Sequence, residues 1–163
     1  DFYEADLDLG LPPELEGRFD VILAADVLEH LRSPQRILEQ MRTLASPTTR
    51  VLVSVPNFGH WYPRTRIAIG KFDYDRRGIL DNDHVRFFTK KSFERLIENS
   101  GYKVVRSDGT GLPVDVVERG AAGESAVPES GVVRAVARFD RATVSLRPQL
   151  FAYQFLYELS PVQ

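Results

Sequence analysis

The sequence predicts an α/β fold, in which helices pack on the faces of a mostly parallel sheet. Short apolar runs of the strand type alternate with segments whose apolar residues recur at helical spacing, and this alternation is typical of that class. Of the 163 residues, 43% are hydrophobic, so the chain can bury a core of ordinary size. We therefore expect residues 1–163 to form a single domain.

The composition excludes several classes of protein. The chain has no cysteine, which excludes a disulfide, a thiolate zinc site and a cysteine nucleophile. With 21 basic and 23 acidic residues the net charge is −2, which argues against a surface built for nucleic-acid phosphates. The longest apolar run, Phe19–Leu28, is shorter than the ~20 residues of a membrane span. We expect a cytoplasmic protein that binds neither nucleic acid nor a membrane.

The first elements follow one another with clear punctuation. Arg18–Ala25 is a continuous apolar run, typical of a strand that is buried on both faces. A helix comes next, with Ser33 as its N-cap and Pro34 in its first turn, and Pro47 stops it. Arg50–Pro56 is a second buried strand, closed by a proline that cannot donate to a ladder.

Residues 57–88 have no regular pattern and are rich in aromatic and basic side chains. Such a long irregular segment in a compact domain is usually a lid or a binding region. Its arginines favour either an anionic acceptor or, more commonly, a solvated basic face. Thr89 then caps a helix that ends at Gly101, and Tyr102–Ser107 is a third strand.

The last part of the chain opens with small and polar residues. Residues 118–131 contain several glycines and a proline, so we expect a mobile loop. Val132–Leu146 has an apolar stripe at helical spacing and predicts a helix. Gln149–Leu159 is aromatic and apolar throughout, which predicts a largely buried strand.

Several of these segments together resemble a known family. FDVILAADVLEHL followed by SPQRILEQMRTLASPTTRVLVSVPN resembles the second half of class I methyltransferases that use S-adenosylmethionine (SAM). VPNFGHW is similar to a segment of the methionine-biosynthesis protein MetW, and ILDNDHVRFFTKKSFERLIENSGYKV to many bacterial members. The resemblance covers about residues 4–108 and lies closest to the branch of ubiquinone-biosynthesis O-methyltransferases and MetW.

The resemblance implies a Rossmann-like sheet of strand order 3-2-1-4-5-7-6, with the last strand antiparallel. The end of strand three is then Phe2–Ala5, and strands four, five, six and seven are the four apolar runs above. Strand one, the Gly-rich turn that cradles SAM and strand two have no counterpart in these residues. The fold is thus expected to be N-terminally incomplete, because strand four would otherwise be a long apolar edge. We expect residues before Asp1, or another chain, to cover this edge, and we expect the 163 residues alone to be inactive and to bind no SAM.

Four residues are candidates for cofactor binding, two by a match to the family and two by their place at the end of a strand. By the match to EADL, Asp6 would accept a hydrogen bond from the adenine amino group and the main chain of Leu7 would meet a ring nitrogen. The alternative for Asp6 is a simple turn before Gly10. Asp26 and Val27 follow strand four, at the edge where open α/β sheets bind ligands, and face the cationic methionine end of SAM in this interpretation.

Asp26, Glu29 and His30 form the pattern D-x-x-E-H. It is similar to E-x-x-E-H, with which some related methyltransferases of the ubiquinone and small-RNA types hold a divalent metal. Carboxylates with an imidazole suit Mg, Mn or Zn, but the first acid here is shorter and three protein ligands specify a metal weakly. We therefore predict no metal, with metal binding as the less favoured alternative to local hydrogen bonding of Glu29 and His30.

Methyl transfer to a hydroxyl or an amine needs a group that accepts a proton. The candidate catalytic bases are His84 and His60, both in the irregular segment. His84 is favoured because Asp81 or Asp83 could fix its tautomer. The alternative is that His84 only fastens the segment that enters the Thr89 helix.

Two functions remain open from the sequence. The first is a SAM-dependent methyltransferase that acts on a small-molecule hydroxyl, carboxyl or amine. The second is a MetW-like regulatory module that contacts a biosynthetic acyltransferase without methyl transfer of its own. A partner enzyme or a second copy of the chain are the protein partners that these functions imply.

Overall fold

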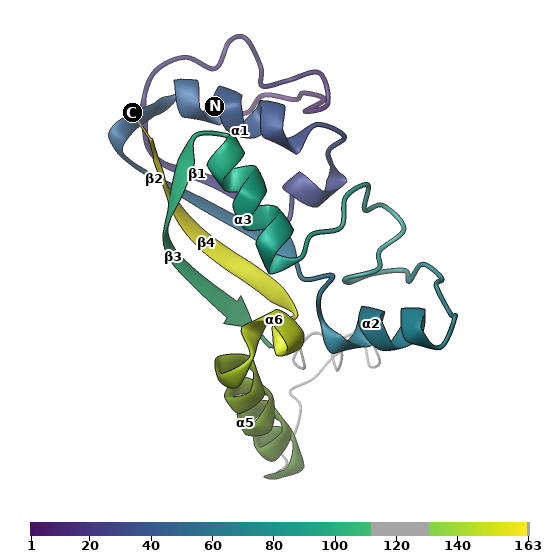
Figure 1. The fold of residues 1–163 in the computed structure, drawn as a ribbon. Helices are drawn as coiled ribbons and strands as arrows, with labels where there is room; N and C mark the ends of the chain where they lie inside the picture. The colour runs from purple at the N-terminus through teal and green to yellow at the C-terminus, as the bar shows by residue number, and fades with distance from the viewer. Residues whose placement is uncertain (112–130, 163) are drawn as a thin grey trace.

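A computed structural model describes residues 1–111 and 131–162 of the chain. These residues form a sheet of four strands in the order β1-β2-β4-β3 (Figure 1). β1 is parallel to β2, whereas β4 is antiparallel to both of its neighbours. This confirms the expected order 4-5-7-6 with an antiparallel last strand. The strands are β1 (Phe19–Ala25), β2 (Ala45–Pro56), β3 (Tyr102–Thr110) and β4 (Gln154–Pro161).

Two helices, α1 (Pro34–Thr43) and α3 (Lys90–Asn99), cover one face of the sheet (Figure 1). Each buries an apolar stripe at helical spacing, as the sequence predicts. The Tyr102 hydroxyl donates to the Leu38 carbonyl over 3.0 Å and joins β3 to α1. Side chains of β2 and β4 that alternate along each strand complete the core, namely Val51, Val53, Val55, Phe155, Tyr157 and Leu159.

The ends of α3 follow the sequence signals. Thr89 accepts from the Ser92 amide, and the Ser92 hydroxyl accepts from the Thr89 amide, which makes a capping box. Gly101 ends the helix with φ of +79°, a conformation that favours glycine. Ser33 stands at the predicted N-cap of α1, but its side chain makes no capping hydrogen bond.

Several predicted boundaries were wrong. Phe2–Ala5 forms no strand, because no neighbouring strand is there to pair with it. β2 begins at Ala45, five residues before the predicted start, because Ala45 pairs with Phe19 across a register shift. The predicted last strand begins only at Gln154.

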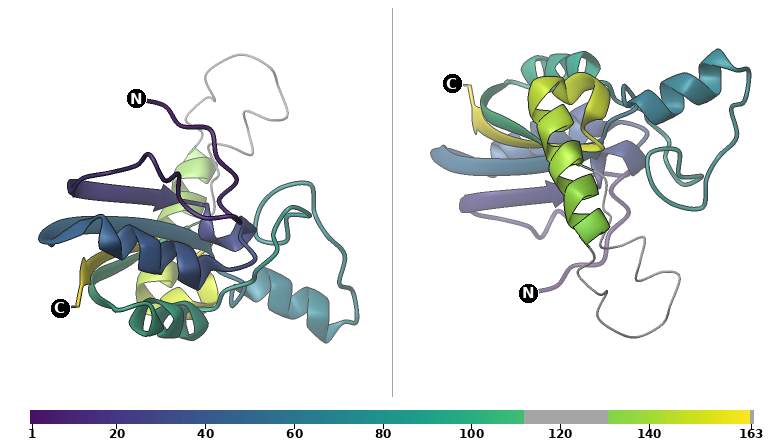
Figure 2. Two further views of the ribbon diagram at one scale, coloured as in Figure 1. Left: turned by 90° about the horizontal axis from the view of Figure 1, so that it is seen from above. Right: turned by 90° about the horizontal axis from the view of Figure 1, so that it is seen from below.

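Two helices interrupt segments for which none was predicted. Pro148 starts the short helix α6 (Pro148–Phe151) ahead of β4, because its fixed φ suits a first helical turn. In the irregular segment, α2 (Trp61–Ala68) forms with His60 as its N-cap. Figure 2 shows α2 and the loop after it projecting away from the sheet.

β1 is an edge of the described sheet. Val21 and Leu23 are 51% and 69% exposed, so the prediction that this strand is buried on both faces is wrong for the described residues. The expected cover of this edge stays a prediction. The predicted helix near the C-terminus is α5 (Gly131–Leu146). Residues 118–130 of the predicted mobile loop lie outside the described residues. Among the described helices, none has both the length and the apolar character that crossing a bilayer requires.

Candidate functional site

A polar cavity lies where β1 and β2 end. Parallel strands place their carboxyl ends at one edge of a sheet, and there β1 leads into the short helix η1 (Leu28–His30). The loop before α3 packs against η1, because the main-chain oxygen of Glu29 accepts from the amides of Val85 and Arg86, each over 2.9 Å. The cavity measures about 290 Å³, and its walls include Asp26, Glu29, His30, His84, Tyr153 and Gln154.

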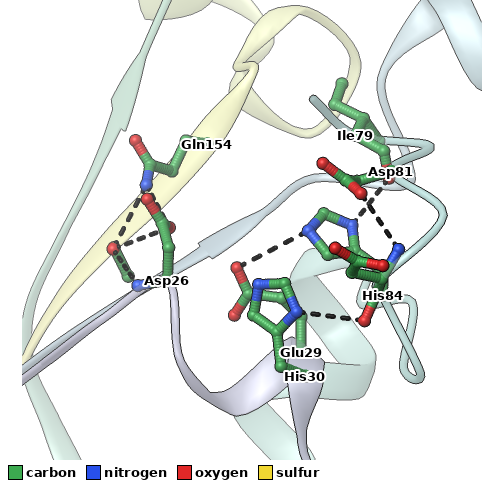
Figure 3. A network of polar contacts seen from close by, with 9 residues as sticks. Asp26, Glu29, His30, Ile79, Asp81, His84 and Gln154 are labelled. Carbon is green, nitrogen blue, oxygen red and sulfur yellow. Dashed lines mark hydrogen bonds and ion pairs between the residues drawn. The ribbon is translucent and has the colours of Figure 1, made fainter. Parts of the chain in front are cut away.

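Asp26 is held from two neighbouring strands (Figure 3). Its carboxylate accepts from the Ser54 hydroxyl over 3.0 Å and from the Gln154 side-chain amide. Its main-chain amide donates to the carbonyl and to the hydroxyl of Ser54. Asp26 has φ of +52°, a backbone conformation that residues other than glycine adopt at a cost in energy.

Glu29 presents a carboxyl group that is buried and unpaired. The residue is 1% exposed, and neither carboxyl oxygen has a hydrogen-bond partner among the described residues. Burial raises the pKa of Glu29 to about 7, and the nearby charge of Asp26 adds to the rise. An unpaired buried polar group of this kind often marks a functional site.

His84 faces Glu29 across the cavity wall (Figure 3). Its Nδ1 lies 3.3 Å from the Ile79 carbonyl, and since a carbonyl only accepts, Nδ1 carries the proton. Nε2 therefore has a free lone pair, 4.0 Å from Oε1 of Glu29. Burial lowers the pKa of His84, so the ring is neutral at pH 7. The sequence suggested that Asp81 or Asp83 fixes the tautomer of His84. In the structure the main-chain carbonyl of Ile79 fixes it instead.

His30 completes a group of three potential metal ligands. Its Nδ1 lies 3.0 Å from the Asp83 carbonyl, so the same reasoning leaves Nε2 as an acceptor. One ligand atom each from Glu29, His30 and His84 lie within 4.8 Å of one another. Histidines that ligate metals commonly donate their other nitrogen to such a carbonyl. The group fits a divalent cation, with His84 in the place that the D-x-x-E-H pattern gives to Asp26.

His60, the other candidate base, lies away from this cavity. It is 1% exposed, and its Nδ1 accepts from the Tyr62 amide at the start of α2. Burial lowers the pKa of His60 to about 4. The structure therefore does not bring His60 and His84 together.

Two other cofactor candidates line a second, apolar cavity. Leu7 and Val27 both line this space of about 340 Å³ between the N-terminal segment, β1 and α1. Asp6 is exposed and accepts from the Asp8 amide over 2.9 Å, which is the turn alternative named above. Leu7 and Val27 thus line the same apolar cavity, whereas Asp26 lines the polar cavity.

Comparison with known structures places this fold. A SAM-dependent methyltransferase from Archaeoglobus fulgidus has a TM-score of 0.56 and 14% identity, over 98% of this chain and 66% of that one. Magnesium protoporphyrin IX methyltransferase from Synechocystis PCC 6803, with bound SAH, has a TM-score of 0.51 and 14% identity, over 96% of this chain and 49% of that one. A putative methyltransferase complexed with the Trm112 methyltransferase activator from Haloferax volcanii has a TM-score of 0.51 and 14% identity, over 98% of this chain and 60% of that one. The chain therefore spans from half to two thirds of these proteins.

Sequence comparison gives the family. No curated protein sequence matches the chain. Residues 4–107, which carry β1, β2 and both helices that cover the sheet, match the methyltransferase domain. The chain belongs to the methyltransferase domain family.

Proposed function

We propose that the native protein transfers a methyl group from SAM to an oxygen or nitrogen of a small-molecule acceptor. The observation that carries this proposal is the unprotonated Nε2 of His84 in a polar cavity at the carboxyl edge of a methyltransferase sheet. The reaction breaks the bond from the sulfonium sulfur to the methyl carbon. It forms a bond from that carbon to the acceptor and leaves SAH. The proton of the acceptor passes to Nε2 of His84.

The N-terminal segment and the polar cavity suit the two ends of SAM. Leu7 and Val27 line one apolar space after the end of β1, and with the edge of β1 covered in the native protein the adenine ring would lie beside these two residues, where Asp6 would meet its amino group. The carboxylate of Asp26 in the polar cavity suits the cationic sulfonium and ammonium groups. Glu29 stabilises the imidazolium that His84 becomes, because its carboxyl oxygen lies 4.0 Å from Nε2. The protein thus contributes mainly orientation and removal of one proton.

Transfer of a labelled methyl group tests this function. The native protein is incubated with methyl-labelled SAM and a panel of small phenols, carboxylates and amines, and the formation of SAH is followed. We expect turnover with at least one class of acceptor. SAM binding without any transfer, together with capture of an acyltransferase, would favour the regulatory function of the MetW branch instead.

The same side chains suggest a second role, which the unpaired carboxyl of Glu29 favours. Glu29, His30 and His84 would hold a divalent cation such as Zn²⁺ or Mn²⁺ and leave coordination positions open to the cavity. Such a cation supplies a Lewis acid that lowers the pKa of an acceptor hydroxyl. Nε2 of His84 would then be a ligand rather than the base.

Metal titration separates the two roles. The metal-free chain is titrated with Co²⁺, and the visible absorption of the bound ion is recorded. For the cation role we expect saturable binding that Glu29→Gln abolishes and that Asp26→Asn retains, because Asp26 is engaged with Ser54 and Gln154. Equal loss in both variants would favour the D-x-x-E-H set. Absence of binding by the parent chain leaves His84 as the base.

A further inference from the structure

Three strand ends meet in one hydrogen-bonded cluster beside the polar cavity (Figure 3). Ser54 is on β2, Gln154 is the first residue of β4, and Asp26 directly follows β1. The Gln154 side-chain amide donates to the Asp26 carboxylate and, over 3.1 Å, to the Ser54 hydroxyl. The Ser54 hydroxyl donates to the same carboxylate over 3.0 Å. We call these three residues the strand-end clamp.

The clamp holds Asp26 in a backbone conformation that residues other than glycine adopt at a cost in energy. With φ of +52°, Asp26 is the only residue other than glycine with positive φ in the described part of the chain. Such strain persists only where surrounding contacts impose it. Here the contacts come from Ser54 and Gln154, which bind both the amide and the carboxylate of Asp26. The clamp therefore fixes the direction in which the chain leaves β1.

The register of the sheet does not need this clamp. β2 and β4 pair continuously from Val51 to Pro56. On the same face of β4 as Gln154, two side chains further along, Glu158 accepts from Arg50 over 2.7 Å and already joins the two strands. Gln154 also donates to Ser54 on β2, but its hydrogen bond to Asp26 lies outside the ladder that pairs β2 with β4. A role in the turn after β1 explains this contact, whereas a role in strand pairing does not.

The turn after β1 determines where the reactive groups lie. Three residues after Asp26, Glu29 places its carboxyl in the cavity and binds the amides of Val85 and Arg86 with its main-chain oxygen. These two amides directly follow His84. A change in the direction of the turn would therefore move Glu29 and His84 together.

We propose that Gln154 is a positioning residue, which acts through Asp26 to hold the turn after β1 and so sets Glu29 and His84 against the bound SAM. This inference rests on the proposed function for its catalytic consequence. Its structural part is independent of that function. This part states that a residue on the last strand controls the hydrogen bonds of the Val85 and Arg86 amides.

The test compares Gln154→Met, which keeps the length of the side chain but cannot donate, with the control Glu158→Gln on the same strand face. Amide hydrogen exchange is measured by NMR in both. We expect the Val85 and Arg86 amides to exchange at least about tenfold faster in Gln154→Met, with the amides of β2 and β4 affected equally in the two variants. Ser54→Ala, which removes the second arm of the clamp, should accelerate the same two amides. Unchanged exchange at Val85 and Arg86 in both clamp variants would overturn the proposal.

Steady-state kinetics of methyl transfer tests the catalytic consequence of the proposal. In the native protein, Gln154→Met should lower kcat by about 10- to 100-fold, the range that a small misplacement of reacting groups produces, and KM for SAM should rise as well, because Gln154 holds the Asp26 carboxylate that faces the cationic groups of SAM. Glu158→Gln should leave both unchanged. Faster exchange in Gln154→Met with unaltered kcat would refute the catalytic part. If the parent protein transfers no methyl group at all, the proposed function fails, and the exchange measurement still decides the positioning role.

Discussion

Glu29→Gln tests an unusual group of the site, a buried carboxyl that accepts no hydrogen bond from the described residues. The raised pKa of about 7, against 4.5 for an exposed carboxyl, means that the folded protein binds a proton more tightly than the unfolded chain does. The stability that this proton confers is complete below pH 4.5 and is lost as the pH rises to about 7. The difference between a pKa of 4.5 and one of about 7 corresponds to about 3 kcal/mol.

Glutamine cannot ionise, so the variant is free of this loss. Urea unfolding of the metal-free chain at pH 5 and pH 8 gives the free energy of unfolding for the parent and the variant. We expect the difference between them, variant minus parent, to rise by about 2–3 kcal/mol from pH 5 to pH 8. Any fixed cost of the unpaired amide cancels in this comparison.

Glu158→Gln is the matched control. The hydrogen bond from Arg50 lowers the pKa of Glu158 from 4.5, so the stabilisation by Glu158 is lost only as the pH falls below about 4.5. The difference between Glu158→Gln and the parent should therefore be nearly the same at pH 5 and at pH 8. An equal difference between Glu29→Gln and the parent at both pH values would refute the burial argument for Glu29.

Three further substitutions have separable outcomes. His84→Ala should lower turnover of the native protein by roughly 100-fold or more while SAM affinity in calorimetry stays nearly unchanged; weakened SAM binding would contradict its role as the acceptor's base. Asp6→Ala should weaken SAM by roughly 1–3 kcal/mol through loss of an adenine hydrogen bond, and unaltered affinity would leave Asp6 as a turn residue. Asn57→Ala should lower the free energy of unfolding by about 2–4 kcal/mol in urea titrations, because the buried Asn57 side chain binds the carbonyls of Gln149 and Ala152 and the Gly59 amide; a loss below about 1 kcal/mol would contradict this account.

Local patterns predicted much of the fold. The existence of the strand β1 and the Thr89 cap of α3 were predicted correctly, because an apolar run and a helix cap are signals carried by neighbouring residues. The order of the strands came from the family resemblance, not from the pattern. Boundaries failed where tertiary contacts decide them. β2 starts at Ala45 because Phe19 lies opposite, and no local signal records that pairing.

The site was predictable only in part. Position at the end of a strand identified Asp26, and a nearby acid drew attention to His84. The burial of Glu29 was missed, because a D-x-x-E-H pattern does not tell which carboxylate points inward. The meeting of Glu29 with His84, 55 positions apart, depends on the loop that packs on η1. His60 was selected for the segment it occupies, yet its buried ring caps α2, a role that any acceptor at an N-cap can fill.

The central claim is that the reactive end of SAM binds in the polar cavity at the carboxyl edge of the sheet. NMR titration of the ¹⁵N-labelled native protein with SAH tests this claim most directly. The account predicts saturable shifts of the amides of Asp26, Val27 and Glu29, with the amides that line the space between β3 and α5, such as Ser107 and Arg141, unmoved. Saturable binding that shifts Ser107 and Arg141 and leaves residues 26–29 unchanged would contradict it.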